Sequence, residues 1–358
     1  MTATELRFSV SFSAYLDRDG RPVGPLPGFA RDAGALVALY RAMVLTRFFD
    51  EKAIALQRTG RLGTYASSLG QEAVGVGLAS AMRADDVLLP SFREHGAQLW
   101  RGVSLEELFL HWGGDSRGND FAGPRGDFPN CIPVAGHFPH AAGVATAIAL
   151  RGEDRVAVAV GGDGSTSKGD FYEALNVVGV WRLPAIFVIN NNQWAISVPR
   201  GRQSAAETLA QKAVAAGIPG EQVDGMDVIA VRDAVERAAA RARGGGGGSL
   251  IECVSYRLGD HTTADDATRY RDDEEVSPHW KEEPIGRLRA YLSQTGAWSK
   301  DDEDGLIAEC REKVEAASEA YLAVPPEPPE TIFAYLFARP PREIEAQVSA
   351  MRQAQGDG

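Results

Sequence analysis

The sequence predicts an α/β protein with a doubly wound, mostly parallel sheet flanked by helices. Two observations carry this prediction. Strand-like and helix-like segments alternate over about 200 residues. Within them, the segment VAVAVGGDGSTSKGDFYEALN at 156–176 is followed by a second apolar run, PAIFVINNNQWAIS, at 184–197. The first apolar run ends on Gly-Asp-Gly and the second on three asparagines, so the pattern is strand, helix, strand, with small polar residues at both strand ends.

The composition is that of a globular protein with a sizeable core. The chain has 358 residues, of which 44% are hydrophobic and 24% are charged. The formal net charge of −12 argues against general binding to nucleic acid, and no apolar run approaches the roughly 20 residues that cross a bilayer. Three scattered cysteines and an N-terminus without a signal-peptide pattern predict a cytoplasmic protein without disulfides.

The elements that flank the strand–helix–strand unit divide the chain into three parts. Residues 1–30 are rich in proline, glycine and polar residues, and we expect them to form an arm that lies on another surface, such as a partner subunit. Apolar residues that recur at intervals of three and four predict a helix over 32–58. We expect the sheet domain to occupy 31–290 and the amphipathic segments after it to form a helical extension over 291–358.

Two segments inside the predicted sheet domain have unusual composition. Residues 113–133 contain little periodicity and predict a long loop, and loops of this length in a compact domain are often functional. The five glycines at 244–248 precede the strand-like LIECVSYR, and we interpret them as a flexible surface turn rather than an inserted linker. The small-residue segments GQEAVGVGLASA and AAGVATAIA are apolar on more than one face, which suits a large core or a subunit interface.

The polar residues at the two strand ends predict a ligand site. In a parallel sheet, ligands bind at the carboxyl ends of the strands, and a right-handed crossover brings these two ends to the same edge. Asp163 stands between Gly162 and Gly164, where the backbone turns sharply, and Asn191 and Asn192 end the next strand. A helix that begins just after the first turn would aim free amides at a phosphate. A carboxylate, an amide and carbonyl oxygens suit Mg²⁺ held together with a diphosphate.

The spacing of these residues identifies a family resemblance. Gly-Asp-Gly and Asn-Asn are separated by 26 residues, 165–190, and a strand–helix–strand pattern fills the interval. This is the thiamine-diphosphate signature. Together with GRLGTYASSLGQEA (60–73), LPSFREHG (89–96) and GDHTTADDATRYR (259–271), it resembles the α subunit of the first, decarboxylating component of 2-oxoacid dehydrogenase complexes. The resemblance covers about residues 30–351 and is greatest for bacterial pyruvate dehydrogenase α subunits.

The resemblance implies a metal site and a diphosphate site. Asp163, Asn192 and the backbone carbonyl of Trp194 would bind Mg²⁺, and the change from the tyrosine usual in the family to Trp194 leaves a carbonyl ligand intact. Gly164 and Ser165 would contact the diphosphate of thiamine diphosphate through their backbone amides. A nicotinamide dinucleotide fold is disfavoured, because no Gly-x-Gly-x-x-Gly stands between a strand and a helix with an acidic residue about 20 residues on.

Further cofactor contacts follow from the same resemblance. Arg93 would bind a phosphate, since a guanidinium fork matches it, whereas Phe92 replaces a tyrosine and lacks its hydroxyl. Ile132 and Val134 would contact the aminopyrimidine ring through their backbone. His137 stands where relatives often have glutamine, and we interpret it as a polar group satisfied within the fold rather than as a catalytic base.

His261 is the candidate catalytic residue. It follows a predicted strand, and a neutral imidazole can exchange protons with a substrate oxygen. The resemblance places this histidine beside the thiazolium ring, although an isolated loop histidine would more often be a solvated surface group. Asp265, Tyr270 and Arg271 are expected to order its loop rather than to react. Asp260 replaces a second histidine of the branched-chain type, which favours pyruvate as the substrate.

The chain lacks half of the expected machinery. The family's chemistry also needs a carboxylate against the aminopyrimidine ring, and no second sheet unit supplies it. The resemblance therefore implies a β subunit in a two-α, two-β tetramer and a lipoyl acyltransferase component that accepts the acyl group. Three alternatives stay open: a pyruvate dehydrogenase, a branched-chain 2-oxoacid or acetoin dehydrogenase, and a non-catalytic subunit that only binds the diphosphate.

Overall fold

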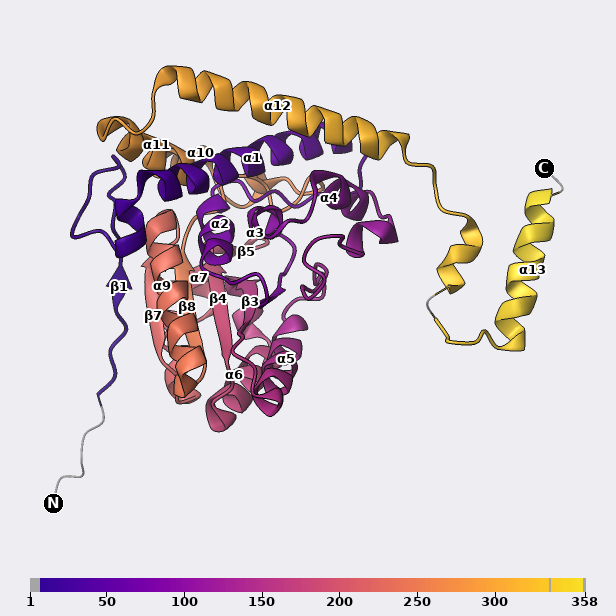
Figure 1. Cartoon of the computed structure of the whole chain (residues 1–358), viewed down its shortest axis with the longest axis horizontal. Coiled ribbons are helices and arrows are strands. Elements are labelled where there is room, and N and C mark those ends of the chain that lie inside the picture. The colour runs from indigo at the N-terminus through magenta and orange to yellow at the C-terminus, as the bar shows by residue number, and fades with distance from the viewer. Residues whose placement is uncertain (1–6, 335, 357–358) are drawn as a thin grey trace.

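A computed structural model describes residues 7–334 and 336–356 of the chain. Its centre is a six-stranded sheet in which each neighbouring pair of strands is parallel, in the order β1–β7–β8–β4–β3–β2 (Figure 1). The predicted fold class is confirmed. The strand bounds are β1 Phe12–Ser13, β2 Val87–Leu89, β3 Ala157–Gly162, β4 Ala185–Asn191, β7 Gly220–Asp224 and β8 Ser249–Val254, and a separate antiparallel hairpin joins β5 Trp194–Ala195 to β6 Val198–Pro199.

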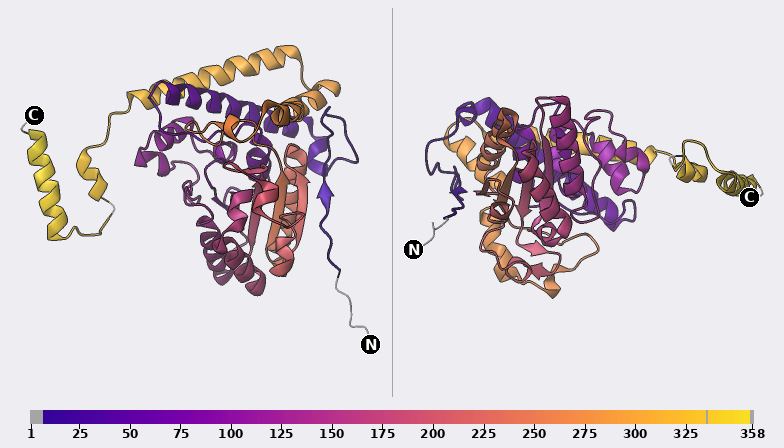
Figure 2. Two further views of the ribbon diagram at one scale, coloured as in Figure 1. Left: turned by 180° about the vertical axis from the view of Figure 1, so that it is seen from behind. Right: turned by 90° about the horizontal axis from the view of Figure 1, so that it is seen from below.

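Helices cover both faces of the sheet. The helices of the described chain are α1 Ala33–Arg58, α2 Glu72–Ser80, α3 His95–Arg101, α4 Leu105–Trp112, α5 His137–Arg151, α6 Gly169–Trp181, α7 Arg200–Gln203, α8 Lys212–Ala215, α9 Val228–Arg241, α10 Asp273–Val276, α11 Pro284–Gln294, α12 Lys300–Ala323 and α13 Arg342–Gly356. Figure 2 shows this layered arrangement from two further sides. Because both faces are covered, the central strands are apolar throughout rather than alternating.

Alternate residues of β3 belong to two separate cores. Ala157 and Ala159 pack with α5 and α6 on one face, whereas Val158 and Val160 pack with α2 and α9 on the other. The register aligns Gly162 of β3 with Asn190 of β4, so both polar strand ends lie at the same edge of the sheet. β3, α6 and β4 follow one another along the chain, as the strand–helix–strand pattern predicted.

The first long helix and the last part of the main body form an outer layer. Asp32 caps α1 by accepting a hydrogen bond from the backbone N–H of Gly34 at 2.9 Å, which satisfies an otherwise free amide. Tyr40 and Met43 of α1 share one core with Leu306 of α12, and α11 and α12 lie along α1 (Figure 1). The sequence predicted this helix over 32–58, within one residue of its observed start.

The described part of the N-terminal arm packs on the chain's own sheet. Phe12 of β1 pairs with Gln222 of β7, and the Asp227 carboxylate accepts hydrogen bonds from the backbone N–H groups of Tyr15 (2.7 Å) and Leu16 (2.8 Å). Residues 12–16 of the predicted arm therefore lie on the chain's own sheet, while residues 1–6 lie outside the described chain. Two strand residues carry too little pattern to be recognised in a sequence.

The glycine run forms a tight turn. Residues Ala242–Gly246 complete a π-helical turn after α9, and Gly245 and Gly247 adopt positive φ angles of 78° and 75°. A Cβ atom on Gly248 would lie 2.6 Å from the carbonyl oxygen of Ala185. The predicted turn is confirmed, but close packing and backbone conformation, rather than flexibility, are the reasons for glycine here.

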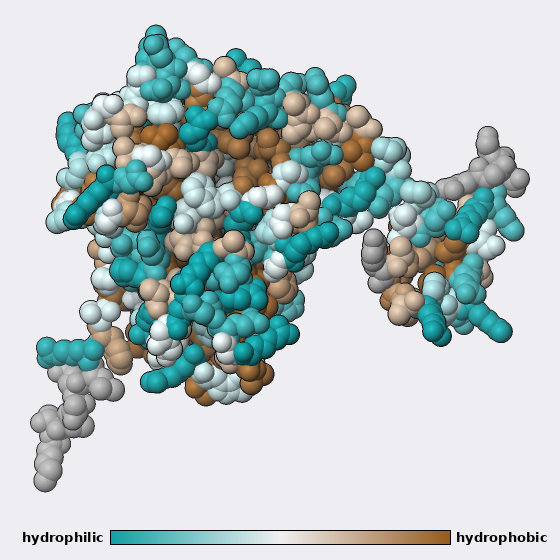
Figure 3. Space-filling model, in the orientation of Figure 1, coloured by the Kyte–Doolittle hydropathy of each residue, from teal (hydrophilic) through white to brown (hydrophobic). Residues whose placement is uncertain are grey.

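The C-terminal residues leave the main body after α12. Residues 324–341 lead to α13, and in Figure 3 this unit stands apart, with hydrophobic residues visible at its centre and hydrophilic ones around them. Across the described residues, no helix combines the length and the apolar character needed to cross a membrane.

Candidate active site

A cavity of about 260 Å³ lies at the carboxyl ends of β3 and β4. Nine of the ten predicted site residues line it, which are Phe92, Arg93, Val134, Asp163, Gly164, Ser165, Asn192, Trp194 and His261. Ile132 is not among the lining residues, and its side chain is exposed to solvent. Segments that are more than 150 residues apart in sequence thus meet at the carboxyl ends of the two strands, where the sequence predicted a ligand site.

Asp163 presents an unpaired carboxylate oxygen in this cavity wall. It begins a 3-10 turn directly after β3, its residue is 1% exposed, and its Oδ2 atom has no hydrogen-bond partner among the described residues. Burial raises the pKa of Asp163 to about 6, while nearby backbone amides and the charges of Arg257 and Arg200 act in the opposite direction. A buried carboxylate without a partner is costly, so this atom fits a cation ligand.

Asn192 lines the same cavity as Asp163 and holds its amide in a fixed orientation. Its Oδ1 atom accepts a hydrogen bond from the backbone N–H of Trp194 at 3.2 Å, and its Nδ2 atom donates to Oε1 of Gln71 at 2.9 Å. The carbonyl of Trp194 accepts a hydrogen bond from Arg257 at 3.2 Å, which leaves its second lone pair for another ligand. The donor set is thus carboxylate, amide and carbonyl oxygen, which suits Mg²⁺.

The glycines of Gly-Asp-Gly leave space rather than adopt unusual dihedral angles. A Cβ atom on Gly162 would meet nothing within 4 Å, and this residue lines the cavity. A Cβ atom on Gly164 would lie 2.9 Å from Cβ of Ala195, so no larger residue fits against the β5–β6 hairpin. Neither glycine has a positive φ angle, so the expected sharp turn is instead a 3-10 turn that ordinary backbone angles allow.

Arg93 joins two segments of the cavity wall. Its Nη1 atom donates to the carbonyl of Ser67 at 2.7 Å, and its Nη2 atom donates to Nδ1 of His261 at 2.9 Å. Burial and the neighbouring Arg257 lower the pKa of Arg93 to about 10, so the guanidinium stays charged at neutral pH. The Phe92 ring packs edge-on against the His261 ring, with centroids 6.2 Å apart.

His261 is a neutral imidazole of defined tautomer. Arg93 and Arg257 both approach its Nδ1 atom, at 2.9 and 3.3 Å, and since a guanidinium can only donate, Nδ1 must accept. The ring proton therefore lies on Nε2. Burial, followed by the charges of Arg93 and Arg257, lowers the pKa of His261 to about 3. The side chain can donate a hydrogen bond from Nε2 but is not protonated further at neutral pH.

Arg257 is a site residue that sequence reasoning missed. It is among the largest fully buried side chains, and it donates to the carbonyl of Ile196 and the hydroxyl of Tyr270, both at 2.8 Å. It thus connects the β5–β6 hairpin to the loop that carries His261. The only signal in the sequence is a charged residue at the end of an apolar strand-like run, SYR, just before the predicted catalytic histidine.

The loop after β8 is ordered by the residues predicted to order it. The Tyr270 hydroxyl donates to Asp265 at 2.5 Å, and the same carboxylate oxygen accepts the backbone N–H of His261 at 2.9 Å. Arg271 donates to the carbonyls of Arg257 and Gly259. These contacts confirm a structural role for Asp265, Tyr270 and Arg271.

His137 is only half satisfied, which corrects the expectation of a polar group fully paired within the fold. Its Nε2 atom donates to the carbonyl of Val160 at 2.6 Å, but its buried Nδ1 atom has no partner among the described residues. Burial lowers the pKa of His137 to about 4, so the ring is neutral and Nδ1 is an acceptor. Because His137 lines the cavity, this acceptor is part of the site.

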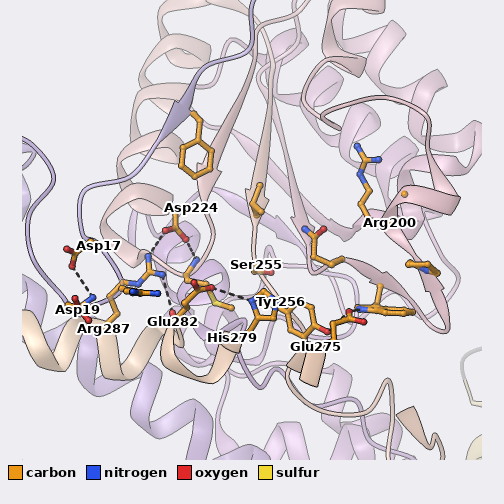
Figure 4. A pocket seen from close by; sticks show the side chains of 18 residues that line it. Asp17, Asp19, Arg200, Asp224, Ser255, Tyr256, Glu275, His279, Glu282 and Arg287 are labelled. Carbon is orange, nitrogen blue, oxygen red and sulfur yellow. Dashed lines mark hydrogen bonds and ion pairs between the residues drawn. The ribbon is translucent and has the colours of Figure 1, made fainter. Parts of the chain in front are cut away.

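A second and larger hollow of about 1090 Å³ is shown in Figure 4, and Arg200, Asp224 and Tyr256 are among the residues that line it. Its carboxylates are already engaged: Asp224 pairs with Arg287 at 2.5 Å, and Glu275 accepts from the Tyr256 hydroxyl at 2.8 Å. The His279 ring stacks on Tyr256 with centroids 3.8 Å apart. Size alone therefore does not mark the functional site. Among the described residues, the smaller cavity holds unpaired atoms of Gln71, His137 and Asp163, whereas the larger hollow holds Nε of Arg287.

Comparison with known proteins agrees with this geometry. Residues 40–330 match the family described as dehydrogenase E1 component. The chain is 45% identical over 283 residues to the pyruvate dehydrogenase E1 component subunit alpha of Staphylococcus aureus strain Mu50, which covers 79% of this chain and 76% of that protein. It is 42% identical over 305 residues to the protein of the same description from Staphylococcus epidermidis strain RP62A, covering 84% and 82%. The chain belongs to the dehydrogenase E1 component family.

Proposed function

We propose that this chain is the α subunit of a heterotetrameric pyruvate dehydrogenase that carries out the oxidative decarboxylation of pyruvate with thiamine diphosphate and Mg²⁺. One observation carries the proposal most directly. The unpaired Oδ2 atom of Asp163 and the oriented amide of Asn192 belong to one cavity at the ends of two adjacent parallel strands. Membership of the dehydrogenase E1 component family supports thiamine diphosphate as the cofactor.

The cavity offers a contact for each end of the cofactor. Asp163, Asn192 and the carbonyl of Trp194 would hold Mg²⁺, and Gly164, Ser165 and Arg93 would contact the diphosphate. The backbone of Ile132 and Val134 would contact the aminopyrimidine ring. When bound, thiamine diphosphate supplies the nucleophilic carbon and the electron sink for decarboxylation.

The protein's own contribution near the reacting carbon is a set of oriented donors and acceptors. His261 would donate a hydrogen bond from Nε2 to a substrate oxygen, since Arg93 and Arg257 fix its tautomer. Burial, followed by the charges of the two guanidinium groups, keeps the imidazole neutral, so it serves as a hydrogen-bond donor over the whole neutral pH range. The half-buried Phe92 ring and the buried Trp194 ring limit the access of water.

A β subunit would complete the site. Ile132 and Val134, which are proposed to contact the aminopyrimidine ring, have side chains that are 54% and 51% exposed. This end of the site therefore needs further protein to enclose the ring. The outer faces of α5 and α6 expose Leu150, Val180 and Trp181, which would suit burial by another subunit. We propose a two-α, two-β tetramer that passes its acyl group to a lipoyl acyltransferase component, and a cytoplasmic location that fits three free cysteines.

Pyruvate is the proposed substrate among the 2-oxoacids. The relatives in Staphylococcus carry the description pyruvate dehydrogenase, and Asp260 stands where the branched-chain type has a second histidine. The alternatives are a branched-chain 2-oxoacid and acetoin. Competition among pyruvate, 4-methyl-2-oxopentanoate and acetoin in the assembled complex would distinguish them, and pyruvate is expected to have the highest kcat/KM.

The test of the overall proposal is expression of the α chain with and without its β partner, followed by an assay of 2-oxoacid decarboxylation with thiamine diphosphate and Mg²⁺. Activity is expected only from the combined chains. Full turnover by the α chain alone would contradict the half-site argument. Metal-dependent cofactor binding without any activity in the combined chains would instead favour a non-catalytic subunit.

A further inference from the structure

Gln71 connects two of the three asparagines at the end of β4, Asn190 within the strand and Asn192 just after it. It is 2% exposed and immediately precedes α2. Its Oε1 atom accepts hydrogen bonds from Nδ2 of Asn190 at 3.0 Å and from Nδ2 of Asn192 at 2.9 Å. Oδ1 of Asn190 in turn accepts from the Ser255 hydroxyl at 2.5 Å. One glutamine oxygen thus holds both amides in this layer of the cavity wall.

The orientation of these amides follows from a donor whose identity is fixed. The backbone N–H of Trp194 can only donate, so the atom of Asn192 facing it at 3.2 Å must be the oxygen. The nitrogen of Asn192 then faces Gln71, and Gln71 must turn its oxygen toward it. The oxygen of Asn192 is thereby kept as an acceptor, which a freely rotating amide would not guarantee.

The segment that carries Gln71 is held rigidly. Gly70 has a φ of +83°, and a Cβ atom there would lie 2.6 Å from the carbonyl oxygen of Tyr256. The backbone N–H of Gly70 donates to Glu72 at 3.0 Å, and the fully buried Glu72 side chain pairs with Arg47 at 2.5 Å. Gln71 is therefore preorganised in the absence of any ligand contact.

The second amide atom of Gln71 has no partner. Nε2 is buried and makes no hydrogen bond within the described residues, although Gln71 lines the cavity. Buried amide nitrogens are almost always paired, so an unpaired one beside a cavity points to a ligand acceptor. Oδ2 of Asp163 and Nδ1 of His137 are further unpaired atoms of residues that line this cavity, so unused donor and acceptor capacity is present in it.

We propose that Gln71 has two tasks at the metal end of the site: it positions the Asn192 amide and it binds the diphosphate. Its Oε1 atom holds the Asn192 amide so that Oδ1 is presented to the cation, and its Nε2 atom donates to an oxygen of the bound diphosphate. This inference rests on the proposed function. It assigns two separate tasks to the two ends of one side chain, so substitutions can separate them.

The test uses the assembled α–β complex with three single variants of the α chain. Gln71→Leu removes both tasks. Gln71→Glu keeps an acceptor for the two asparagines but replaces the donor. Gln98→Leu is the matched control, because Gln98 is also 2% exposed with an unpaired amide atom but does not line the cavity. Calorimetry measures the Kd of thiamine diphosphate and the Mg²⁺ concentration that gives half-saturation, and thermal unfolding checks the fold.

Gln71→Leu is expected to raise both quantities about ten- to a hundredfold, as the loss of a hydrogen bond to a charged group predicts. Gln71→Glu is expected to restore the half-saturating Mg²⁺ concentration while the Kd of thiamine diphosphate stays raised. Unchanged binding in Gln71→Leu, or an equal loss in Gln98→Leu, would overturn the proposal. Unchanged cofactor affinity in Gln71→Glu would overturn the donor task. Failure of the wild-type complex to show Mg²⁺-dependent binding would count against the proposed function instead.

Discussion

Nη2 of Arg93 lies 2.9 Å from Nδ1 of His261. This contact assigns the imidazole proton to Nε2, because the guanidinium offers only hydrogens. Arg257 reinforces the assignment, because its Nη1 atom lies 3.3 Å from the same nitrogen. The candidate catalytic histidine is thus a hydrogen-bond donor with a fixed tautomer, which differs from a general base that gains and loses a proton near neutral pH.

Replacement of His261 by glutamine should therefore lower kcat without changing the shape of its pH profile. A positioned donor in the transition state contributes roughly 10²- to 10⁴-fold, so a loss of that order is expected. The pKa of His261 is lowered to about 3, so its titration falls outside the assay range between about pH 6 and pH 8. The measurement is kcat of the assembled complex across that range.

The matched control is His111→Gln, since His111 bonds Asn119 at 2.8 Å and does not line the cavity. It should leave kcat near the wild-type value. A limb with an apparent pKa near 6.5 in the wild type, absent from His261→Gln, would show that the imidazole titrates during turnover and would contradict the assignment.

Replacement of Arg93 by lysine should weaken cofactor binding although the charge is kept. Lysine cannot contact Ser67 and His261 at the same time, because it lacks the planar fork of arginine. The loss of a charge-assisted hydrogen bond costs about 1.5–3 kcal/mol, so a rise in the Kd of thiamine diphosphate of roughly 10- to 100-fold is expected. Titration calorimetry on the complex would measure it, and equal affinities in wild type and variant would refute a phosphate contact.

Replacement of Asp163 by asparagine should abolish Mg²⁺-dependent cofactor binding. The carboxylate supplies the only negative charge in the proposed donor set of Asp163, Asn192 and the Trp194 carbonyl, so its loss should exceed the roughly 10- to 100-fold effect of removing an outer partner of a metal ligand. Chelation of the metal from the wild-type complex should give the same result, with recovery on adding Mg²⁺. Tight cofactor binding that persists in chelator would argue against a metal site.

His95 should make the fold less stable as the pH falls. It is completely buried, its Nε2 atom accepts from the Trp112 indole at 3.0 Å, and burial lowers its pKa to about 3. Between this value and the unfolded value of about 6.5, the unfolded chain binds a proton that the folded chain does not. The free energy of unfolding should therefore fall by up to about 1.4 kcal/mol per pH unit as the pH drops through that window.

The comparison of wild type with His95→Gln isolates this contribution, because buried carboxyls such as Asp163, whose pKa is raised to about 6, act with the opposite sign in both proteins. Chemical unfolding of the complex between about pH 7 and pH 5 should show a steeper loss of stability for the wild type. Parallel curves would mean that His95 is protonated in the folded protein.

The sequence could predict that Asp163 and Asn192 lie in one cavity because its signals are local. Asp163 and Asn192 each follow an apolar strand directly, and the geometry of parallel sheets then brings the two strand ends together. His261 was accessible by resemblance because it stands in a recognisable stretch after β8. These positions required no knowledge of side-chain direction.

The residues that sequence analysis missed depend on contacts between distant segments. The role of Arg257 comes from the β5–β6 hairpin, whose carbonyls at Trp194 and Ile196 accept its hydrogens about 60 positions away in the chain. Gln71 meets Asn192 across 121 positions. His137 was misjudged for the same reason, since the partner of Nε2 is found 23 positions later and no pattern shows that Nδ1 lacks one.

The pairing of Phe12 with Gln222 has a consequence for biosynthesis. β1 leaves the ribosome long before β7 and β8, so its backbone edge stays unpaired until these two strands have been translated. Removal of the residues up to Leu16 would delete β1 and leave the edge of β7 permanently unpaired. The truncated polypeptide should then tend to associate through β7 rather than remain dispersed.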